Sequence, residues 1–526
     1  MAALAGSDVR LAELVASMSL ATDLGLGQPM EHVLRSCVLG LRIAEDLELG
    51  EAERAVVYYV ALLAWLGCHA DAHEQSAWFG DDIALRADRH LADPVGMGFV
   101  LGHVGRGQPP ARRALRLGSL LVSGRHALAA MESTHCIIAG LFAVRLGLGT
   151  EVRDGLQHVF ERWDGKGTPG GIAGEEIALS ARIVVIADIV ESFRRLGGVA
   201  AAVDVARRRA GGQFDPTLAG HVCDNADALL DGLDEAVGWE AAIAAEPALA
   251  RRMSGVELDA ALAAIADFAD LKSPYTTGHS RGVADRAATA ALRAGLGEPT
   301  AAELRRAGLL HDVGRLGVSN TIWDKPGTLS ETEMERVRMH PYLTQRIFSR
   351  SPRLAALAEV AAAHHERLDG SGYPRGLAGG ALSPEARILA AADAYQAMTE
   401  PRPHRPAGSP EDAARQLRED VSRGRLDRDA VDAVLGASGH RVPRRRDGPA
   451  GLTQREVEVL ALLARGLSNK AIAAQLVVSP KTVGHHVEHI YRKIGCSTRA
   501  AASLFAMQHG LLSEFETSLK DGANAR

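Results

Sequence analysis

The sequence predicts an all-α protein made of several helical domains. Hydrophobic residues make up 47% of the chain but aromatic residues only 4%, a balance typical of helices rich in alanine and leucine. The 526 residues are too many for one hydrophobic core and indicate three or four domains. Near the C-terminus, apolar residues recur three and four positions apart, as in amphipathic helices. We expect domains at residues 1–240, 254–440 and 451–515.

Charge is distributed unevenly along the chain. From Arg441 to Arg526 there are 13 lysines and arginines against 7 acidic residues, whereas the whole chain has a net charge of −6. A basic C-terminal module on an acidic body is typical of a protein whose tail binds nucleic acid.

Nothing in the sequence indicates export or insertion into a membrane. The five cysteines are scattered without a pairing pattern, as expected in a reducing compartment. The N-terminus lacks a basic segment followed by an apolar stretch and a cleavage site. The uncharged run from Val56 to Cys68 is too short to span a bilayer. We therefore expect a cytoplasmic protein with no membrane partner.

The first predicted domain repeats landmarks of the second. The segment Glu161 to Pro169 parallels Glu366 to Pro374 at an offset of 205 residues. Further upstream, His32 corresponds to His279 at an offset of 247. The difference places about 42 extra residues in the first half before His135, and we expect this insertion to be partly loop.

The second half carries seven candidate metal ligands, all imidazoles or carboxylates: His279, His311, Asp312, His340, His364, His365 and Asp393. A ligand set without thiolate suits iron, manganese or zinc in a hydrolytic site better than a structural zinc. Adjacent residues of a helix point about 100° apart, so His311 and Asp312 can hold one metal together. The second oxygen of Asp312 could then bridge to another metal.

Four motifs occur here in a fixed order. They are the His-Asp pair at 311–312, the His-His pair at 364–365, the Gly-Tyr-Pro turn at 372–374 and Asp393 on a later apolar segment. In this order, the stretch from Leu271 to Gly439 resembles the HD-GYP branch of the HD phosphohydrolase superfamily. The resemblance implies a helical domain that binds two or three metals and hydrolyses cyclic di-GMP to linear pGpG or GMP.

The resemblance also implies a ligand set. One metal would be held by His279, His311, Asp312 and Asp393, and the other by Asp312, His340, His364 and His365, so that Asp312 bridges. Members with three metals carry a glutamate where this chain has Tyr275. We therefore expect two divalent ions, most readily iron or manganese.

The expected catalytic residues are Asp312 and Arg315. Arg315 stands where the family usually has a lysine that meets a substrate phosphate, and a guanidinium can make a bidentate contact there. The candidate contacts to a cyclic dinucleotide substrate are Arg315, Lys325, Arg367, Asp369, Gly372, Tyr373 and Pro374.

The corresponding positions of the first half have lost this chemistry, since they hold Ala64, Trp65, Val159, Phe160 and Thr168. The potential ligands that remain are His32, His135 and Asp188, too few for a dinuclear centre. We expect a noncatalytic pseudo-domain used for sensing, docking or dimerisation.

The C-terminal module follows a basic linker at residues 441–450, which contains two prolines and a glycine and cannot be the interior of a regular element. Thr453 and Glu456 have the spacing of a capping box at the start of a helix. Ser468 can cap a second, short helix. Ser479, followed by a proline, can cap a third helix at about 481–494, and a fourth helix is expected from about Thr498.

A short helix, a tight turn and a longer helix with polar outward positions predict a helix-turn-helix. The motifs at residues 452–456, 467–473 and 479–483 closely resemble the LuxR-type DNA-binding domain. The resemblance implies a homodimer on duplex DNA, with the third helix in the major groove and the fourth helix in the dimer contact. The candidate DNA contacts are Lys481, Thr482, His485, His486, His489, Arg492 and Lys493. Lys481, Arg492 and Lys493 are expected at phosphates.

Three functions are compatible with these motifs. The favoured hypothesis is a transcriptional regulator that joins a cyclic di-GMP phosphodiesterase to a DNA-binding output domain. A second is a transcription factor that senses a metal or nucleotide without hydrolysis. A third is a phosphohydrolase that acts on another nucleotide. The complete ligand set favours an enzyme over a sensor, and the Gly-Tyr-Pro turn favours a cyclic dinucleotide over other nucleotides.

Overall fold

The computed structural model describes residues 8–92, 97–106, 109–233, 238–247, 250–442 and 449–512. The chain divides into two compact units, Met1–His440 and Arg441–Arg526. Each unit is helical, which confirms the all-α prediction, and a single two-stranded sheet is present among the described residues. The predicted linker at 441–450 falls largely outside the described residues.

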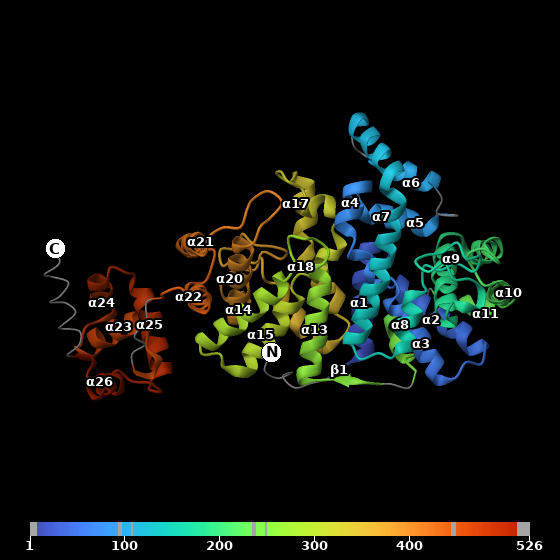
Figure 1. Ribbon diagram of the computed structural model, residues 1–526. Coiled ribbons are helices and arrows are strands. Elements are labelled where there is room, and N and C mark those ends of the chain that lie inside the picture. The colour runs from blue at the N-terminus through green and yellow to red at the C-terminus, as the bar shows by residue number, and fades with distance from the viewer. Residues whose placement is uncertain are drawn as a thin grey trace. The chain divides into compact units, whose positions relative to one another are not determined.

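The first half of the larger unit begins with a short strand and continues as helices (Figure 1). Its elements are β1 (Val9–Arg10), α1 (Leu11–Leu26), α2 (His32–Asp46), α3 (Glu51–Leu63), η2 (Leu66–His69), α4 (Ala72–Phe79), α5 (Asp82–Leu91), α6 (Met97–His103), α7 (Pro110–Arg145), α8 (Thr150–Gln157), η3 (Gly174–Glu176), α9 (Leu179–Arg209), α10 (Pro216–Asp224), α11 (Ala226–Leu230) and α12 (Gly238–Ala244).

The second half supplies the remaining elements of this unit. They are β2 (Arg252–Met253), α13 (Gly255–Asp270), α14 (His279–Arg293), α15 (Gly297–Leu310), η4 (Val313–Gly317), α16 (Asn320–Trp323), α17 (Glu331–Arg338), α18 (His340–Phe348), α19 (Pro352–Ala361), η5 (Gly379–Ala381), α20 (Pro384–Thr399), α21 (Pro410–Ser422) and α22 (Arg428–Ala437).

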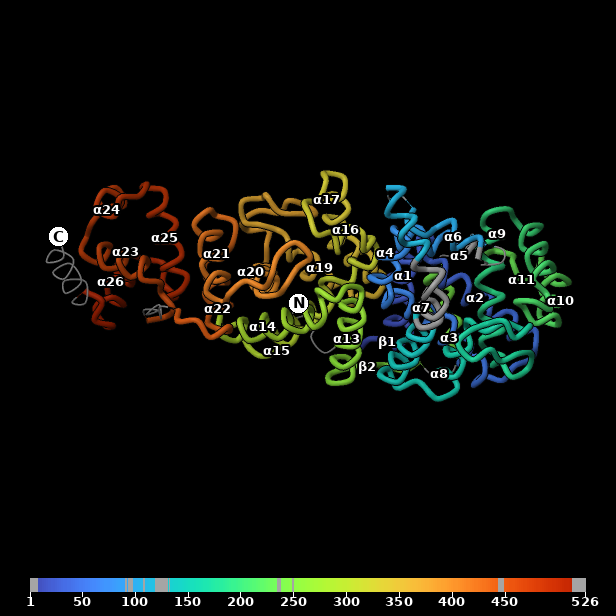
Figure 2. Tube along the Cα trace, turned by 45° about the horizontal axis from the view of Figure 1, so that its top comes forward, coloured from blue at the N-terminus to red at the C-terminus, as the bar shows by residue number. Residues whose placement is uncertain are grey.

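Helix α1 lies where the two halves meet (Figures 1 and 2). It is buried along almost its entire length, and it contacts α2 and α3 of its own half as well as η4 and α18 of the second half. A helix that is apolar all round is stable only inside a core. The halves that the sequence predicts as separate domains therefore share one hydrophobic core around α1.

Polar contacts also join the two halves. The buried carboxylate of Asp82 in α5 accepts hydrogen bonds from the Ser319 hydroxyl at 2.7 Å and the Asn320 amide at 2.8 Å. It also pairs with the buried ammonium of Lys272 at 3.5 Å and with Arg86 at 3.1 Å. β1 pairs with β2, with Val9 opposite Met253.

The insertion of the first half is mostly helical. The segment after η2 forms α4, α5, α6 and the long α7, and the partial loop that the sequence predicts has its place where α6 ends at His103 and α7 begins at Pro110. The Asp81 carboxylate accepts the amides of Ile83 and Ala84 and so caps α5, and Pro110 stands at the first position of α7. These local start signals favour helices over loop.

The smaller unit contains α23 (Gln454–Ala464), α24 (Asn469–Leu476), α25 (Pro480–Lys493) and α26 (Arg499–Gln508). All four predicted starts are confirmed. The hydroxyls of Thr453, Ser468, Ser479 and Thr498 each accept the amide three residues ahead. The unit has a hydrophobic core of its own, which includes Leu460, Ile472, Val483, Ile490 and Ala502.

None of the described helices is long and apolar enough on its own to cross a membrane. One bent pair, Glu51–His69 with Ala72–Phe79, meets the criteria of length and composition only when its two parts are taken together.

Candidate metal centre

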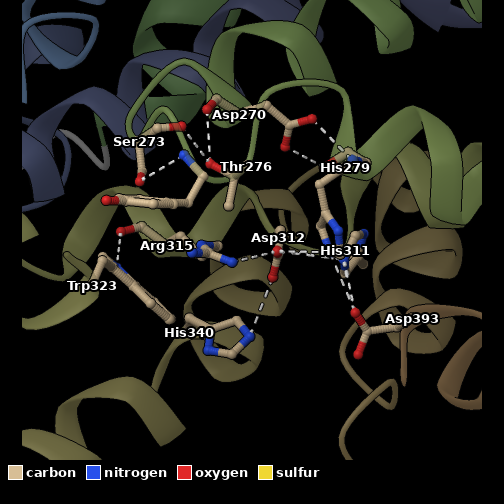
Figure 3. Close-up of polar contacts among 12 residues, drawn as sticks. Asp270, Ser273, Thr276, His279, His311, Asp312, Arg315, Trp323, His340 and Asp393 are labelled. Atoms are coloured by element: carbon tan, nitrogen blue, oxygen red, sulfur yellow. Dashed lines mark hydrogen bonds and ion pairs between the residues drawn. The ribbon is translucent and has the colours of Figure 1, made fainter. Parts of the chain in front are cut away.

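The seven predicted ligands come together from five places in the second half. His279 opens α14, His311 and Asp312 follow α15, and His340 opens α18. The His364–His365 pair follows α19, and Asp393 lies within α20. Figure 3 shows Asp312 between the imidazoles of His340 and His311, with Asp393 on the far side of His311.

The two oxygens of Asp312 face different groups of histidines. Its Oδ2 lies 3.7 Å from Nε2 of His279 and 3.5 Å from Nε2 of His311. Its Oδ1 lies 3.3 Å from Nε2 of His340 and 3.8 Å from Nε2 of His364. This division is the geometry required of a carboxylate that bridges two ions.

Asp393 completes both groups from the opposite side. Its Oδ1 lies 3.3 Å from Nε2 of His279 and 3.9 Å from Nε2 of His311. Its Oδ2 lies 3.8 Å from Nδ1 of His365. The second carboxylate therefore also touches both sides of the cluster.

Main-chain carbonyls orient three of the imidazoles. Nδ1 of His311 lies 2.7 Å from the Gly308 carbonyl, and Nδ1 of His364 lies 2.7 Å from the Ala361 carbonyl. Nδ1 of His340 lies 2.6 Å from the carbonyl of Val337. A carbonyl near the end of a helix lacks an intrahelical partner and is free to accept such a bond. Each ring is thereby fixed with Nε2 towards the centre, as in metal-binding histidines.

The donor set fits divalent metal ions. The ligand atoms of His279, His311 and Asp312 lie within 4.8 Å of one another, and so do those of His340, His364 and His365. Nε2 of His311 is buried and has no hydrogen-bond partner among the described residues. An unpartnered buried nitrogen is costly, and a metal ion would satisfy it.

The protonation states of Asp312, His364 and His365 also favour metal binding. Burial alone would raise the pKa of Asp312, but the charges of His311 and Arg315 hold it well below its usual value. Burial and the neighbouring His311 lower the pKa of His364 to about 3, and burial likewise lowers that of His365. Ionised carboxylates and neutral imidazoles are the forms that bind metals.

Arg315 lies at the edge of this cluster. Its guanidinium pairs with Oδ2 of Asp312 at 3.0 Å and stacks 3.9 Å from the centre of the Trp323 ring (Figure 3). A guanidinium stacked on an indole is held in one orientation. The predicted phosphate contact is therefore placed directly beside the predicted bridging carboxylate.

The Gly-Tyr-Pro turn closes over His365. The Tyr373 ring lies 4.7 Å from the His365 ring, and the main-chain amide of Tyr373 donates to the His365 carbonyl at 3.2 Å. Beneath the turn, the buried carboxylate of Glu366 accepts the amides of Arg375 and Leu377, both at 2.8 Å. A Cβ at Gly372 would lie 2.4 Å from the Cα of Glu366, so only glycine fits.

The other predicted substrate contacts have protein partners. The Lys325 ammonium pairs with Glu333 at 2.6 Å. Arg367 donates to the carbonyls of His364 and Glu366, and the Asp369 carboxylate accepts from Ser371.

Two residues that the sequence analysis missed support the cluster. The Glu400 carboxylate lies 2.8 Å from Nδ1 of His279 and so orients this ligand, as main-chain carbonyls orient three of the others. Arg402 donates to Glu400 at 3.1 Å and to the Tyr275 carbonyl at 2.5 Å. The only feature of the sequence that could have indicated Glu400 is its position, seven residues after Asp393 and near the end of the same helix.

Replacing Glu400 by glutamine should weaken metal binding without unfolding the protein. The amide can still reach His279, but it removes the negative charge that strengthens this ligand. Loss of such an outer contact typically lowers metal affinity about 10- to 100-fold. Titration of metal-stripped protein with Mn²⁺ measures the effect, and Glu419→Gln, an exposed change on α21, serves as the control. Equal affinities in the two variants would show that Glu400 has no role in the centre.

The equivalent place in the first half holds aromatic side chains. His32 lies 3.1 Å from Asp188, and the indole of Trp65 donates to the same carboxylate at 2.9 Å. Nε2 of His135 bonds to the Ala64 carbonyl at 2.7 Å, and its ring lies 4.6 Å from the ring of Phe160.

The first half nevertheless keeps the turn. The buried Glu161 carboxylate accepts the amides of Gly170 at 2.6 Å and Gly171 at 3.2 Å. A Cβ at Gly167 would lie 2.4 Å from the Cα of Glu161. At the offset of 205 residues, the Gly170 contact and the crowding at Gly167 repeat those of Arg375 and Gly372, whereas the second amide differs.

The predicted DNA contacts lie along α25. Lys481, Thr482, His485, His489 and Arg492 are exposed, and His486 is half-buried. The ammonium of Lys493, by contrast, pairs with Glu456 at 2.7 Å and donates to the Gly451 carbonyl at 2.9 Å. Lys493 therefore ties α25 to the start of the module.

Two protein families match this chain. The HD domain family matches residues 143–218 and 263–430, so its match reaches into both halves. The family of bacterial regulatory proteins described as the luxR family matches residues 450–506.

Individual proteins match over different lengths. The 3′3′-cGAMP-specific phosphodiesterase 3 of Vibrio cholerae is 32% identical over 81% of this chain and 94% of its own length. The cyclic di-GMP phosphodiesterase response regulator RpfG of Xanthomonas campestris is 40% identical over 27% of this chain and 38% of its own. The crystal structure of a Vibrio cholerae phosphodiesterase specific for cyclic GMP-AMP has 29% identity and a TM-score of 0.59, and covers 83% of this chain and 99% of that chain.

Proposed function

Because this chain belongs to the HD-domain phosphodiesterases and ends in a luxR-family regulatory domain, we propose that it hydrolyses a guanine-containing cyclic dinucleotide and regulates transcription. The observation that carries the proposal is the division of the Asp312 carboxylate between two groups of buried histidines. Such a cluster serves hydrolysis of phosphate esters, and the C-terminal module offers an exposed helix to DNA.

The cluster would hold two divalent ions, iron or manganese. His279, His311, Asp312 and Asp393 would hold one, and Asp312, His340, His364 and His365 the other. Bound ions supply Lewis-acid neutralisation of the phosphodiester and make a water acidic enough to act as nucleophile near neutral pH. The donor atoms are all nitrogen or oxygen, with no sulfur, which supports iron or manganese.

The protein contributes two guanidinium groups beside the cluster. Burial and then the charge of Arg315 lower the pKa of Arg402, so the two cations are close enough to repel each other. A phosphodiester anion between them would relieve this repulsion. We assign to Arg315 the neutralisation of the scissile phosphate, and to Arg402 the support of Glu400.

The substrate candidates are cyclic di-GMP and 3′3′-cGAMP. The sequence motifs favour cyclic di-GMP. The relative that matches over 94% of its length is named for 3′3′-cGAMP, which supports it as the second candidate. Both have a guanine base and two phosphodiester linkages.

The regulatory output would come from a dimer of the C-terminal module on duplex DNA. Leu504 and Met507 on α26 are 52% and 58% exposed and lie three residues apart, on one face of the helix. A pairing of this face with its copy would bury both side chains and support the predicted homodimer.

The direct test is turnover by the full chain loaded with Mn²⁺ or Fe²⁺. Cyclic di-GMP, 3′3′-cGAMP and cyclic di-AMP are incubated with the protein, and linear products are separated by chromatography. We expect hydrolysis of at least one guanine-containing substrate and slower hydrolysis of cyclic di-AMP. Absence of any linear product with all three would contradict the proposed activity and leave a binding protein.

A further inference from the structure

The first half contains a cavity of about 540 Å³, within the usual size range of small-molecule sites. Its walls come from α4, α5, α9 and the segment 159–168. The cavity corresponds in position to the metal centre of the second half. The repeat offsets relate its Trp65 to Asp312 and its Phe160 to His365.

The floor of this cavity is aromatic. The ring centres of Trp65 and Phe160 lie 5.7 Å apart, and the His135 ring lies 4.6 Å from Phe160. Phe79 and Phe99 extend this surface. Planar rings pack well against such a surface, whether offset or edge to face. The position that binds metal in the second half therefore has, in the first half, a surface suited to a flat aromatic ligand.

The walls carry cationic side chains, namely Arg86, Arg89, Arg162, Lys166 and Arg209. The Arg89 guanidinium lies 5.4 Å from the centre of the Phe160 ring, so charge and aromatic surface adjoin. The offset of 247 places Cys68 where the second half has Arg315. Arg86 and Arg89 belong instead to α5, within the insertion, so these cations have no counterpart in the second half.

The hydrogen-bonding state of Arg86 indicates an anionic ligand. Its side chain is 5% exposed, and one terminal nitrogen donates to the Gly25 carbonyl at 3.0 Å and to Asp82 at 3.1 Å. Its other terminal nitrogen and Nε have no hydrogen-bond partner among the described residues. Asp82 also pairs with Lys272, so one carboxylate serves two buried cations. Buried donors without acceptors are costly, and a phosphate oxygen would satisfy them.

The acidic wall residues are already engaged. The Asp188 carboxylate bonds to His32 and Trp65, and Glu161 accepts two main-chain amides. Burial raises the pKa of Asp71 to about 7, so this group is partly neutral at physiological pH. The acidic wall residues therefore offer little unpaired negative charge to an anionic ligand.

We propose that this cavity binds a nucleotide, with its base against Trp65 and Phe160 and its phosphate at Arg86 and Arg89. This function goes beyond hydrolysis, because the cavity lies in the half without the metal ligands. A fatty acid would match one positive charge and an aliphatic wall. This cavity instead suits a nucleotide. Its arginines match a phosphate, its aromatic floor matches a planar ring, and the side-chain amides of Gln75 and Gln213 match the hydrogen-bonding edge of that ring.

The test measures binding by calorimetry to the full chain, stripped of metal and carrying Asp312→Ala to remove turnover. The probes are the four ribonucleoside monophosphates, with guanosine, ribose 5-phosphate and decanoate for comparison. We expect at least one monophosphate to bind about tenfold or more tightly than guanosine or ribose 5-phosphate, since each lacks one half of the contacts.

Two further variants locate the site. Arg89→Glu, on half-buried α5, and Lys166→Glu, whose side chain is 78% exposed at the cavity, should each weaken the monophosphate about tenfold or more. The control is Arg153→Glu on the surface of α8, which should change affinity less than twofold. Because Lys166 is exposed, its replacement does not threaten folding. Absence of binding by all four monophosphates, unchanged affinity in both cavity variants, or tighter binding of decanoate would each overturn the proposal.

Discussion

Replacing Asp312 by alanine is expected to abolish hydrolysis of the cyclic dinucleotide. The change removes a carboxylate whose two oxygens face different groups of histidines, at 3.5 Å from His311 and 3.3 Å from His340. Bound metals supply several kcal/mol of transition-state stabilisation, and each 1.4 kcal/mol or so is a factor of ten in rate. We therefore expect turnover to fall by about a thousandfold or more.

Two measurements accompany this prediction. Elemental analysis of reconstituted protein should give about two metal ions per chain for the wild type and fewer for Asp312→Ala. The control is His135→Ala, the same type of change in the first half, which should leave turnover nearly unchanged. Equal turnover in wild type and Asp312→Ala would rule out the assigned centre. A loss in His135→Ala as large as that in Asp312→Ala would show that the first half takes part in catalysis.

The C-terminal module should bind duplex DNA when residues 449–512 are expressed alone, since it forms a compact unit with its own core. Each phosphate contact releases a counterion, so affinity falls with salt. For two or three contacts by one module, we expect a loss of about 10- to 40-fold between 50 and 200 mM salt. Mobility-shift assays over this range of salt measure the slope.

The structure separates the cations of α25 by role. Lys481→Ala and Arg492→Ala should weaken binding to all DNA sequences and lower the salt slope by about one each. Lys493 pairs with Glu456, so Lys493→Ala should act chiefly by lowering the melting temperature of the module. Changes at His485 should alter which sequences are preferred. A module that is folded but shows no salt-sensitive binding would be a docking domain instead.

Local chemistry made much of the fold predictable. The starts of the C-terminal helices depend on a hydroxyl and an amide three residues apart, a relation that is visible in any sequence. The ligand cluster was predictable because its motifs recur in a recognisable order. The arrangement of the two halves was not, because it depends on α1 and on contacts such as that of Asp82 with Lys272, which are 190 residues apart.

Glu400 illustrates the same limit at the site. A glutamate near the end of a helix has no special sequence context, and its role arises only because α20 returns beside the start of α14. Lys325 is the converse case. A Lys-Pro-Gly motif favoured a substrate contact, while the structure places its ammonium against Glu333, a partner that spacing alone does not identify.

A buried glutamate and a crowded glycine lie beneath the corresponding turn in both halves, and in each half the glutamate accepts the amide nine residues ahead, although only one half has the histidine pair. A feature that persists after the chemistry has gone is required by the architecture. In other tandem chains of this kind, a buried glutamate and a crowded glycine should therefore be taken as marks of common ancestry. Only the imidazoles and carboxylates of the metal-binding cluster distinguish a catalytic copy of the domain from a noncatalytic one.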